Sequence, residues 1–184
     1  MNSPPGNREN RSDEALIAAL NSGDLSAFDD LYFRYRDWVL RLAYRFTGHP
    51  DDALDVVQET FTYLFRKFPG FVLTARLTTF LYPVVKNISL AARRKRLKHL
   101  GEHPVLDPSA APSSDPDQSR KELQDALGAL SEPHRETLLM RFVDDMTIPE
   151  IAEALGVPEG TVKSRLHHAI ASLRGDPKIK RHFG

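Results

Sequence analysis

The stretch IPEIAEALGVPEGTVKSRLHHAIASLR, residues 148–174, decides the fold of the C-terminal part of the chain. Thr147 and Glu150 enclose Ile-Pro in the spacing of a capping box, which predicts the start of a helix. Gly156 follows this helix where a tight turn favours left-handed backbone. A second helix is predicted directly after Pro158, so the stretch is expected to form a helix-turn-helix.

The two predicted helices share a small apolar core and leave one polar face outward. The core residues are Ile151, Ala152, Leu155, Val157, Val162, Leu166, Ala169 and Leu173. The second helix opens with hydroxyl and basic residues, which suit contacts with phosphates and with base edges in a major groove. These residues are Thr161, Lys163, Ser164 and Arg165. A plain helical hairpin with a solvated polar face is the alternative for the same pattern.

Outward from this motif, residues 101–118 contain four prolines and small polar residues without periodic apolar positions, as in a flexible linker. The linker separates a module over residues 12–100 from one over residues 119–184, and residues 1–11 are predicted to be a disordered tail. No segment shows a sustained period-two pattern. The predicted fold is therefore all-α, with two small helical domains joined by a flexible linker.

Apolar residues at spacings of three and four predict the helices of both modules. In the first module, Ser12 caps a first helix that ends near Gly23. A longer second helix ends at Gly48 and Pro50, and two more helices are expected over residues 51–68 and 78–97. The core residues expected in the first three helices are Leu16, Ile17 and Leu20; Phe28, Leu31, Tyr35, Trp38, Leu42 and Phe46; and Leu54, Val57, Phe61, Leu64 and Phe68. Those of the first two helices of the second module are Leu123, Leu127 and Leu130; and Leu138, Leu139 and Phe142.

The charges are unevenly distributed along a chain whose formal net charge is zero. Residues 86–99 hold six lysines and arginines and no acid, and residues 160–184 hold six against one acid. Residues 122–159 hold nine acids and two basic residues. Because salt confines each charge to about 10 Å, a polyanion responds to these local fields and not to the sum. Two solvated basic faces without a ligand are the alternative.

Several classes of protein are disfavoured by the composition. The chain has no cysteine, so disulfides, thiolate zinc sites and cysteine nucleophiles are excluded. The N-terminus lacks the apolar core of a signal peptide, and the longest weakly charged run, 77–85, is too short to span a membrane. The histidines lack metal-ligand spacing, and there is no glycine-rich phosphate loop. We therefore expect a cytoplasmic non-enzyme without cofactor, metal, small-molecule substrate or membrane insertion.

Three stretches carry a resemblance to a known family. EIAEALGVPEGTVKSRL, residues 150–166, resembles the C-terminal promoter-binding region of sigma factors. DDALDVVQETF (51–61) and LTTFLYPVVKNISLAARRKR (77–96) resemble their N-terminal region. The ordered pair of modules is similar to the compact extracytoplasmic-function (ECF) group of the sigma-70 family. The resemblance implies sigma region 2 over residues 12–100, sigma region 4 over 119–184, and core RNA polymerase, promoter DNA and an anti-sigma factor as partners.

The resemblance also implies three functional surfaces. The upstream (−35) element would be bound as duplex by Thr161, Lys163, Ser164, Arg165, His167 and His168. The downstream (−10) element would be held as a melted strand, which needs positive charge and rings or pockets for unstacked bases. The residues implied are Phe71, Phe80, Tyr82, Lys86, Asn87, Arg93, Arg94 and Arg96, and the hydrophobic core is the alternative for each of the three rings. Core polymerase would be bound by Asp52, Asp55, Gln58 and Glu59.

The sequence departs from the family pattern at a few positions. Phe80 replaces the usual tryptophan, Ala91 replaces a common aspartate, and His167-His168 stand where arginine is frequent. Pro83 falls inside the fourth predicted helix, where it removes one backbone hydrogen bond and is expected to kink the chain. Two other functions are compatible with the helix-turn-helix. One is a regulator that binds an operator without polymerase, and the other is an adaptor that binds only proteins.

Overall fold

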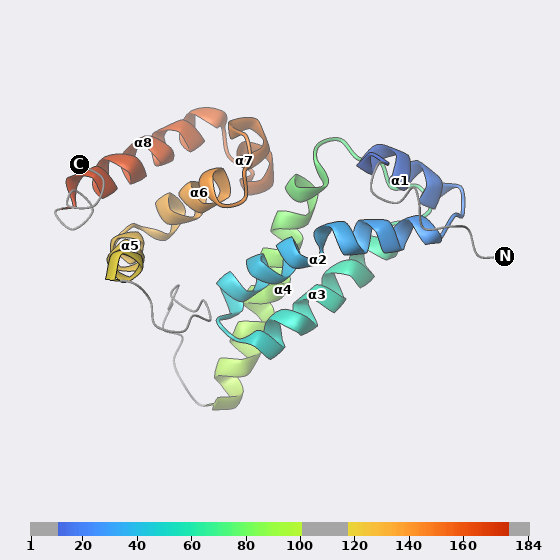
Figure 1. Ribbon diagram of the computed structural model, residues 1–184, viewed down its shortest axis with the longest axis horizontal. Helices are drawn as coiled ribbons and strands as arrows, with labels where there is room; N and C mark the ends of the chain where they lie inside the picture. Colours follow the sequence, from blue (N-terminus) through green and yellow to red (C-terminus); the bar gives the residue numbers. More distant parts are fainter. Residues whose placement is uncertain (1–10, 101–117, 177–184) are drawn as a thin grey trace. The chain divides into compact units, whose positions relative to one another are not determined.

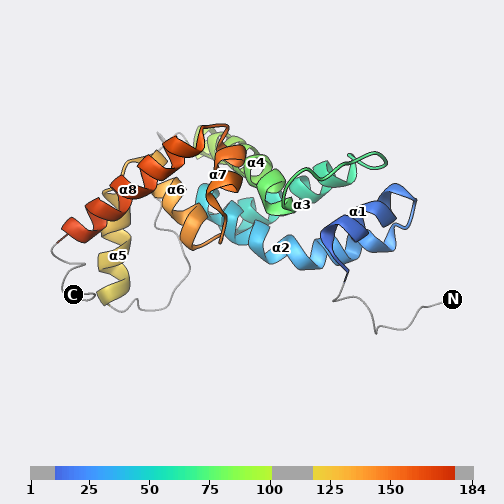
Figure 2. The same cartoon turned by 90° about the horizontal axis from the view of Figure 1, so that it is seen from above.

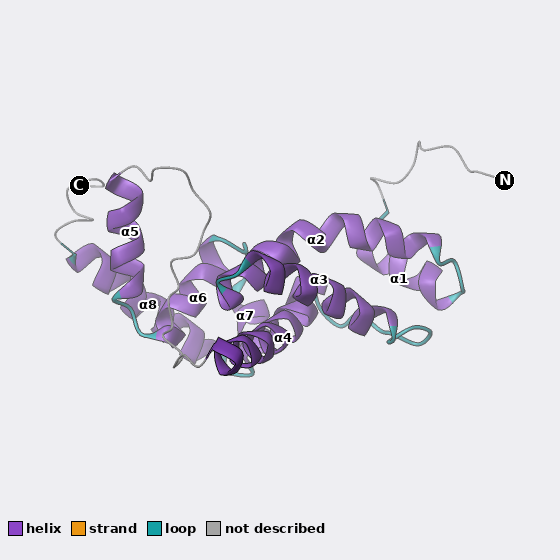
Figure 3. Cartoon of the chain, turned by 90° about the horizontal axis from the view of Figure 1, so that it is seen from below, coloured by secondary structure: helices purple, strands orange, loops and turns teal. Residues whose placement is uncertain are grey.

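The computed structural model describes residues 11–100 and 118–176, and within them every regular element is an α-helix (Figure 3). The all-α prediction is confirmed. The chain divides into two compact units, Met1–Val105 and Leu106–Gly184, which we call the N-terminal and C-terminal units. The helices are α1 Asp13–Asn21, α2 Ser26–Thr47, α3 Pro50–Phe65, α4 Leu77–Leu100, α5 Gln118–Gly128, α6 Glu132–Phe142, α7 Ile148–Leu155 and α8 Glu159–Gly175 (Figure 1).

In the N-terminal unit, α2 packs against α1, α3 and α4, and α3 also packs against α4 (Figures 1 and 2). The predicted core residues of α1 are all buried, and Ser12 caps this helix by accepting a hydrogen bond from the Ala15 N–H at 3.3 Å. Leu31 and Leu42 of α2 are completely buried, whereas Tyr35 and Trp38 are half-buried. Burial of such side chains is the main stabilising contribution.

The core face predicted for α3 is partly wrong. Leu54 was expected in the core and is 51% exposed. The buried residues of α3 are Ala53, Val56, Val57, Thr60, Phe61 and Leu64. Because α3 contacts both α2 and α4, its buried face is wide and includes small residues such as Ala53, which a hydrophobicity pattern undervalues. The helix also ends at Phe65 and not at residue 68.

The predicted N-terminal tail is wrong at its last residue. Residues 1–10 of the predicted tail and residues 101–117 of the predicted linker lie outside the described residues. Arg11 is described, and its side chain and carbonyl both have partners. Its guanidinium forms an ion pair with the carboxylate of Asp30 at 2.7 Å, and its carbonyl accepts a hydrogen bond from Arg34 at 2.7 Å. These contacts fix the chain just before α1 begins.

In the C-terminal unit, the core is built around two methionines that the sequence pattern did not single out. Met140 and Met146 are completely buried together with Ile151 and Val162. Phe142, expected in the core, is 65% exposed. The inward face of α6 consists of Thr137, Leu138 and Met140, so the last residue of the helix points outward. Leu123 is also largely exposed, at 38%, and Leu155 and Val157 are only half-buried.

The predicted helix-turn-helix is confirmed in its local geometry. The Thr147 side chain accepts from the Glu150 N–H, and the Glu150 carboxylate accepts from the Thr147 N–H at 2.7 Å, which completes the capping box. Gly156 adopts φ 64° and ψ 37°, in the left-handed region that favours glycine. The Val157 N–H donates to the Ala152 carbonyl at 3.0 Å and closes the turn before α8, which packs against α7.

None of the helices within residues 11–100 and 118–176 is both long and apolar enough to span a membrane.

Candidate nucleic-acid interface

Helix α8 presents a polar face opposite its buried one. Val162 and Ala169 are completely buried and Leu166 nearly so, which fixes the inward side of the helix. The four side chains predicted to approach base edges are all exposed: Lys163, Ser164, His167 and His168. Thr161 and Arg165, predicted to contact phosphates, are half-buried beside them. Every predicted residue of the recognition helix is therefore accessible at its surface or edge.

The polar face of α8 makes few contacts that would compete with DNA. The Lys163 ammonium lies 3.7 Å from the Glu159 carboxylate, one helical turn away, and both side chains are more than half exposed. Such surface pairs are weak because water and salt screen them. The His168 ring stacks on His134 of α6 at 5.8 Å between ring centroids. The sequence pattern missed His134, because residues in different helices share no periodicity.

Helix α4 carries most of the side chains predicted to hold a melted strand. Asn87 and Arg94 are exposed, and Lys86, Arg93 and Arg96 are half-buried. The Lys86 ammonium lies 5.9 Å from the centre of the Phe46 ring. Pro83 lies inside α4 without ending it, since the helix continues to Leu100.

One predicted strand-binding residue is wrong. Tyr82 is only 1% exposed, and its ring packs edge-on against Phe46 of α2 at 6.2 Å. It lies on the face of α4 that also buries Leu81 and Val85. A ring in this position belongs to the hydrophobic core and has no free face for an unstacked base.

The other two predicted rings belong to an aromatic cluster, which we define as Tyr63, Phe68, Phe71 and Phe80. The Phe71 ring lies 4.8 Å from Phe80 and 5.6 Å from Phe68, and Tyr63 stacks on Phe80 with an interplanar angle of 20°. The Lys67 ammonium lies 4.6 Å from the centre of the Tyr63 ring. Phe71 and Phe80 are half-buried and Tyr63 is 39% exposed, so the cluster combines accessible π-surface with a positive charge. Sequence reasoning missed Tyr63 and Lys67.

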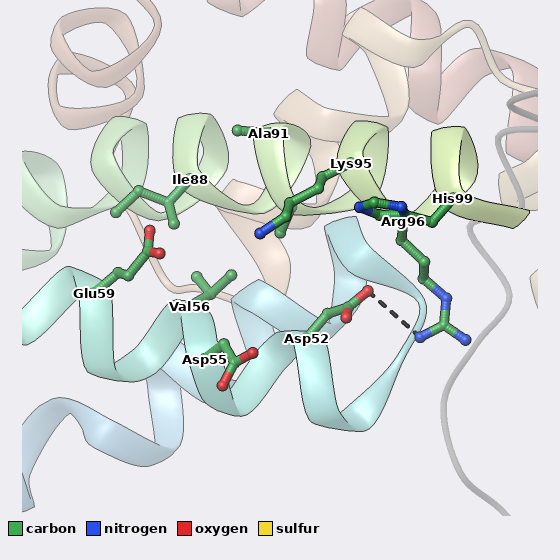
Figure 4. Close-up of a pocket in the computed structure, with 10 residues that line it drawn as sticks. Asp52, Asp55, Val56, Glu59, Ile88, Ala91, Lys95, Arg96 and His99 are labelled. Carbon is green, nitrogen blue, oxygen red and sulfur yellow. Dashed lines mark ion pairs between the residues drawn. The ribbon is translucent and has the colours of Figure 1, made fainter.

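The acidic face of α3 lies next to the basic side of α4. Asp55, Gln58 and Glu59 are exposed, as a protein-binding surface requires. Asp52 is different: its carboxylate lies 3.6 Å from the Arg96 guanidinium, and its side chain is only 21% exposed (Figure 4). The structure therefore pairs a residue predicted to bind polymerase with one predicted to bind DNA.

A groove of about 450 Å³ runs along the surface where α3 and α4 meet (Figure 4). Acids of α3 and basic side chains of α4 line it over an apolar floor that includes Val56 and Ile88. Lys95 and His99, which are not among the residues implied for strand binding, also line the groove on the α4 side. Ala91, where the family often has an aspartate, also lines the groove. A second hollow, of about 630 Å³, extends past Gln58 to residues 62, 63 and 66.

No cluster of three or more histidine or acidic side chains in the described ranges could hold a metal ion. The arrangement instead suits binding to macromolecules. A helix-turn-helix with a polar recognition face, in the same chain as a helical unit with a basic helix and an acidic helix, defines a class of two-unit helical DNA-binding proteins.

Comparison with known proteins shows the family. Residues 31–98 match the family model described as Sigma-70 region 2, and residues 120–173 match Sigma-70, region 4. The chain is 32% identical over 173 residues to the ECF RNA polymerase sigma factor SigM of Mycobacterium tuberculosis strain H37Rv, covering 91% of this chain and 86% of SigM. The chain belongs to the ECF sigma factors of the sigma-70 family, and its function is to direct transcription from promoters.

Two further similarities agree with this assignment. The chain is 26% identical over 176 residues to the ECF RNA polymerase sigma factor SigW of Bacillus subtilis strain 168, covering 86% of this chain and 92% of SigW. Its fold is similar to that of the sigma factor RpoE of Bartonella quintana, which was crystallised in complex with the anti-sigma factor NepR. That match has a TM-score of 0.63 and 21% identity, and it covers 85% of this chain and 98% of RpoE.

Proposed function

We propose that the chain directs core RNA polymerase to promoters through three surfaces. The recognition face of α8 binds the upstream (−35) element as duplex, and α4 with the aromatic cluster holds the downstream (−10) element as a melted strand. The exposed acids of α3 bind polymerase. The observation that carries the proposal is the outward polar face of α8, in a chain whose other unit matches region 2.

At the upstream element, Lys163, Ser164, His167 and His168 approach base edges while Thr161 and Arg165 position the phosphate backbone. Each good base contact contributes about 1–3 kcal/mol of discrimination. An imidazole cannot make the bidentate contact that arginine makes with guanine, so contacts from the two histidines are weaker than those of the arginine frequent in the family.

At the downstream element, the strand runs along the basic side of α4 and its unstacked bases meet the aromatic cluster. Phe71 and Phe80 offer ring surface, and Lys86, Asn87, Arg93, Arg94 and Arg96 supply polar and positive groups. Base stacking on an aromatic side chain contributes about 1–3 kcal/mol. Tyr82 is not part of this surface because it is buried.

At the polymerase, Asp55, Gln58 and Glu59 form the contact surface. Their exposure on one side of α3 suits a basic partner, and Asp52 contributes to the negative field while it remains paired with Arg96. In this role the chain itself performs no chemistry, and bond formation belongs to the polymerase. We place this activity in the cytoplasm, where polymerase and chromosome meet.

We also propose an anti-sigma factor as a partner that holds the chain inactive. The proposal rests on family membership and on the RpoE–NepR complex, whose sigma factor shares the fold. A protein of this class should suppress transcription by the purified chain, and excess of the chain should restore it.

The decisive experiment is run-off transcription with purified chain, core polymerase and a library of promoter fragments. Defined transcripts that require the chain are the expected result. Binding to an operator duplex without any polymerase-dependent transcript would instead support the independent regulator, and binding to neither would support the adaptor.

The polymerase surface has its own test. The double variant Asp55→Lys/Glu59→Lys should lose binding to core polymerase while the full chain keeps its affinity for upstream duplex. The matched control is Asp29→Lys/Asp37→Lys, which reverses two exposed carboxylates on α2. Polymerase affinity that survives the first double variant rules out the α3 surface as the contact.

A further inference from the structure

We propose that Asn21, the last residue of α1, is a positioning residue that holds the Phe71 ring where an unstacked base can meet it. This inference rests on the proposed capture of a melted strand by the aromatic cluster. Asn21 lies before residue 31, where the match to the region 2 family model begins. No motif in the sequence connects it with residues fifty positions further along the chain.

The contact is made entirely through the Asn21 side-chain amide. Its Oδ1 accepts hydrogen bonds from the backbone N–H groups of Gly70 at 2.7 Å and Phe71 at 3.2 Å. Its Nδ2 donates to the carbonyl of Phe71 at 2.8 Å. One side chain thus hydrogen-bonds to both the N–H and the carbonyl of Phe71, so the backbone on each side of the residue that carries the ring is fixed to Asn21.

The chemistry of this contact requires an amide. A carboxylate offers only acceptors and could keep the two bonds from Gly70 and Phe71 but not the third. An apolar side chain of similar size keeps none of them. Gly70 has φ 101°, a left-handed conformation that residues with a Cβ rarely adopt, so a glycine here lets the loop turn and present both N–H groups to Asn21.

The position of the Phe71 backbone determines what its ring can contact. The ring lies between Phe68 and Phe80 in the aromatic cluster. Since a loop backbone without such ties samples many conformations, release from Asn21 would let the ring leave this arrangement. Preorganisation of a binding group raises affinity because less entropy is lost on binding. Asn21 therefore acts on strand affinity through the position of the Phe71 ring.

The test is a double-mutant cycle on the full chain bound to core polymerase. The probe is a single-stranded downstream-element oligonucleotide with 2-aminopurine at successive positions, whose fluorescence reports an unstacked base. Phe71→Ala should weaken strand binding by about tenfold or more, and Asn21→Leu by about threefold to tenfold. The double variant should bind no more weakly than Phe71→Ala, because a residue that acts through another adds nothing once that residue is gone.

Two controls separate positioning from a general loss of structure. Ser22→Ala removes a hydrogen bond at the same end of α1, from the Ser22 hydroxyl to the Ala19 carbonyl at 2.8 Å, and should leave strand binding unchanged. Affinity for upstream duplex and for core polymerase should be unchanged in all variants. If Asn21→Leu does not fold, Asn21→Asp replaces it, with a smaller loss of strand affinity that again disappears in the Phe71→Ala background.

The outcomes distinguish the two proposals. If Phe71→Ala leaves strand binding intact, the proposed role of the aromatic cluster fails. If Phe71→Ala weakens binding but the Asn21 effect adds to it in full, or if Asn21→Leu has no effect, the cluster remains and the positioning role of Asn21 is overturned.

Discussion

Helices α8 and α4 both carry basic side chains that we propose bind DNA, but their surroundings differ. On α8, the Lys163 ammonium pairs with a carboxylate of its own helix, Glu159. On α4, the Arg96 guanidinium is paired with Asp52 of the neighbouring helix, across a groove with a basic and an acidic side. The exposed lysine of the α8 face is thus paired within its own helix, whereas the basic side of α4 is paired with a neighbouring helix.

This difference suggests that the two surfaces are used differently. Weak contacts within α8 leave its cations available, so duplex binding by the C-terminal unit needs little rearrangement. In the N-terminal unit, an acid proposed to attract polymerase also attracts a cation proposed to attract DNA. We therefore expect a partner that engages Asp52 to change the field at Arg96, so that the two proposed binding events are linked.

The largest expected effect belongs to the α8 face. Lys163→Glu should weaken binding of the full chain to upstream duplex by about 1–3 kcal/mol, roughly fivefold to 150-fold, because it removes a base contact and introduces repulsion with phosphates. Fluorescence anisotropy with a labelled duplex measures the loss. The control is Lys121→Glu, an exposed charge reversal on α5 of the same unit. Equal losses for both variants would mean that only net charge matters and that α8 has no special role.

The difference between contacts within one helix and contacts between helices also explains which structural features the sequence could predict. The capping residues, Gly156 and the buried positions Val162, Leu166 and Ala169 follow from local spacing, so the helix-turn-helix is predicted correctly, although Leu155 and Val157 are only half-buried. The positions of Leu54 and Phe142 were wrong because burial there depends on which neighbours a helix meets. Hydrophobicity alone does not identify those neighbours.

The N-terminal surface was predictable only in part, for a related reason. The acids of α3 and the basic residues of α4 could be selected from the sequence, but their pairing could not, because it joins residues 52 and 96. Tyr82 was selected by its position in a motif, and its burial depends on contact with α2. The role of Asn21 could not be predicted from the sequence, because its partners are backbone atoms of a distant loop. Backbone N–H and C=O groups are nearly the same in every residue type, so the loop sequence does not indicate the contact.

A second expected effect concerns how the N-terminal unit is held together. The Tyr35 hydroxyl of α2 hydrogen-bonds to the Asp13 carboxylate of α1. Burial and this hydrogen bond raise the pKa of Tyr35 above its ordinary value. Unfolded tyrosine ionises near pH 10, so the contribution of Tyr35 to the free energy of unfolding should be constant below that pH and should fall as the pH rises above it. The pairing is therefore a source of alkaline sensitivity in this unit.

Tyr35→Phe should lower the free energy of unfolding by about 1–2 kcal/mol at neutral pH and flatten its decline above pH 10. Urea unfolding followed by the fluorescence of Trp38, the only tryptophan, reports on this unit specifically. Tyr44→Phe on the same helix is the control. Since all five tyrosines lie in the N-terminal unit, the C-terminal unit should show no tyrosine-dependent decline. An unchanged alkaline decline in Tyr35→Phe would exclude this residue as its source.

The smallest effect tests the difference between α4 and α8 directly. Double-mutant cycles measure the coupling of Asp52 with Arg96, using Asn and Gln replacements, and that of Glu159 with Lys163, using Gln at both positions. Partly exposed pairs contribute about 0.2–1 kcal/mol, and exposed pairs one turn apart on a helix about 0.3–0.5 kcal/mol. The first coupling should be the larger because the Asp52 carboxylate is more shielded from water.

The functional consequence of this small coupling is the sharper test. If the pair restrains Arg96, Asp52→Asn should strengthen binding of the downstream strand, and the gain should vanish in an Arg96→Gln background. Both couplings should shrink as salt is raised, since surface charges are screened. A gain in strand affinity that persists without Arg96 would mean that Asp52 repels DNA through its general negative field. In that case the charges of α3 and α4 would act on DNA independently, and the Asp52–Arg96 pair would not couple polymerase binding to strand binding.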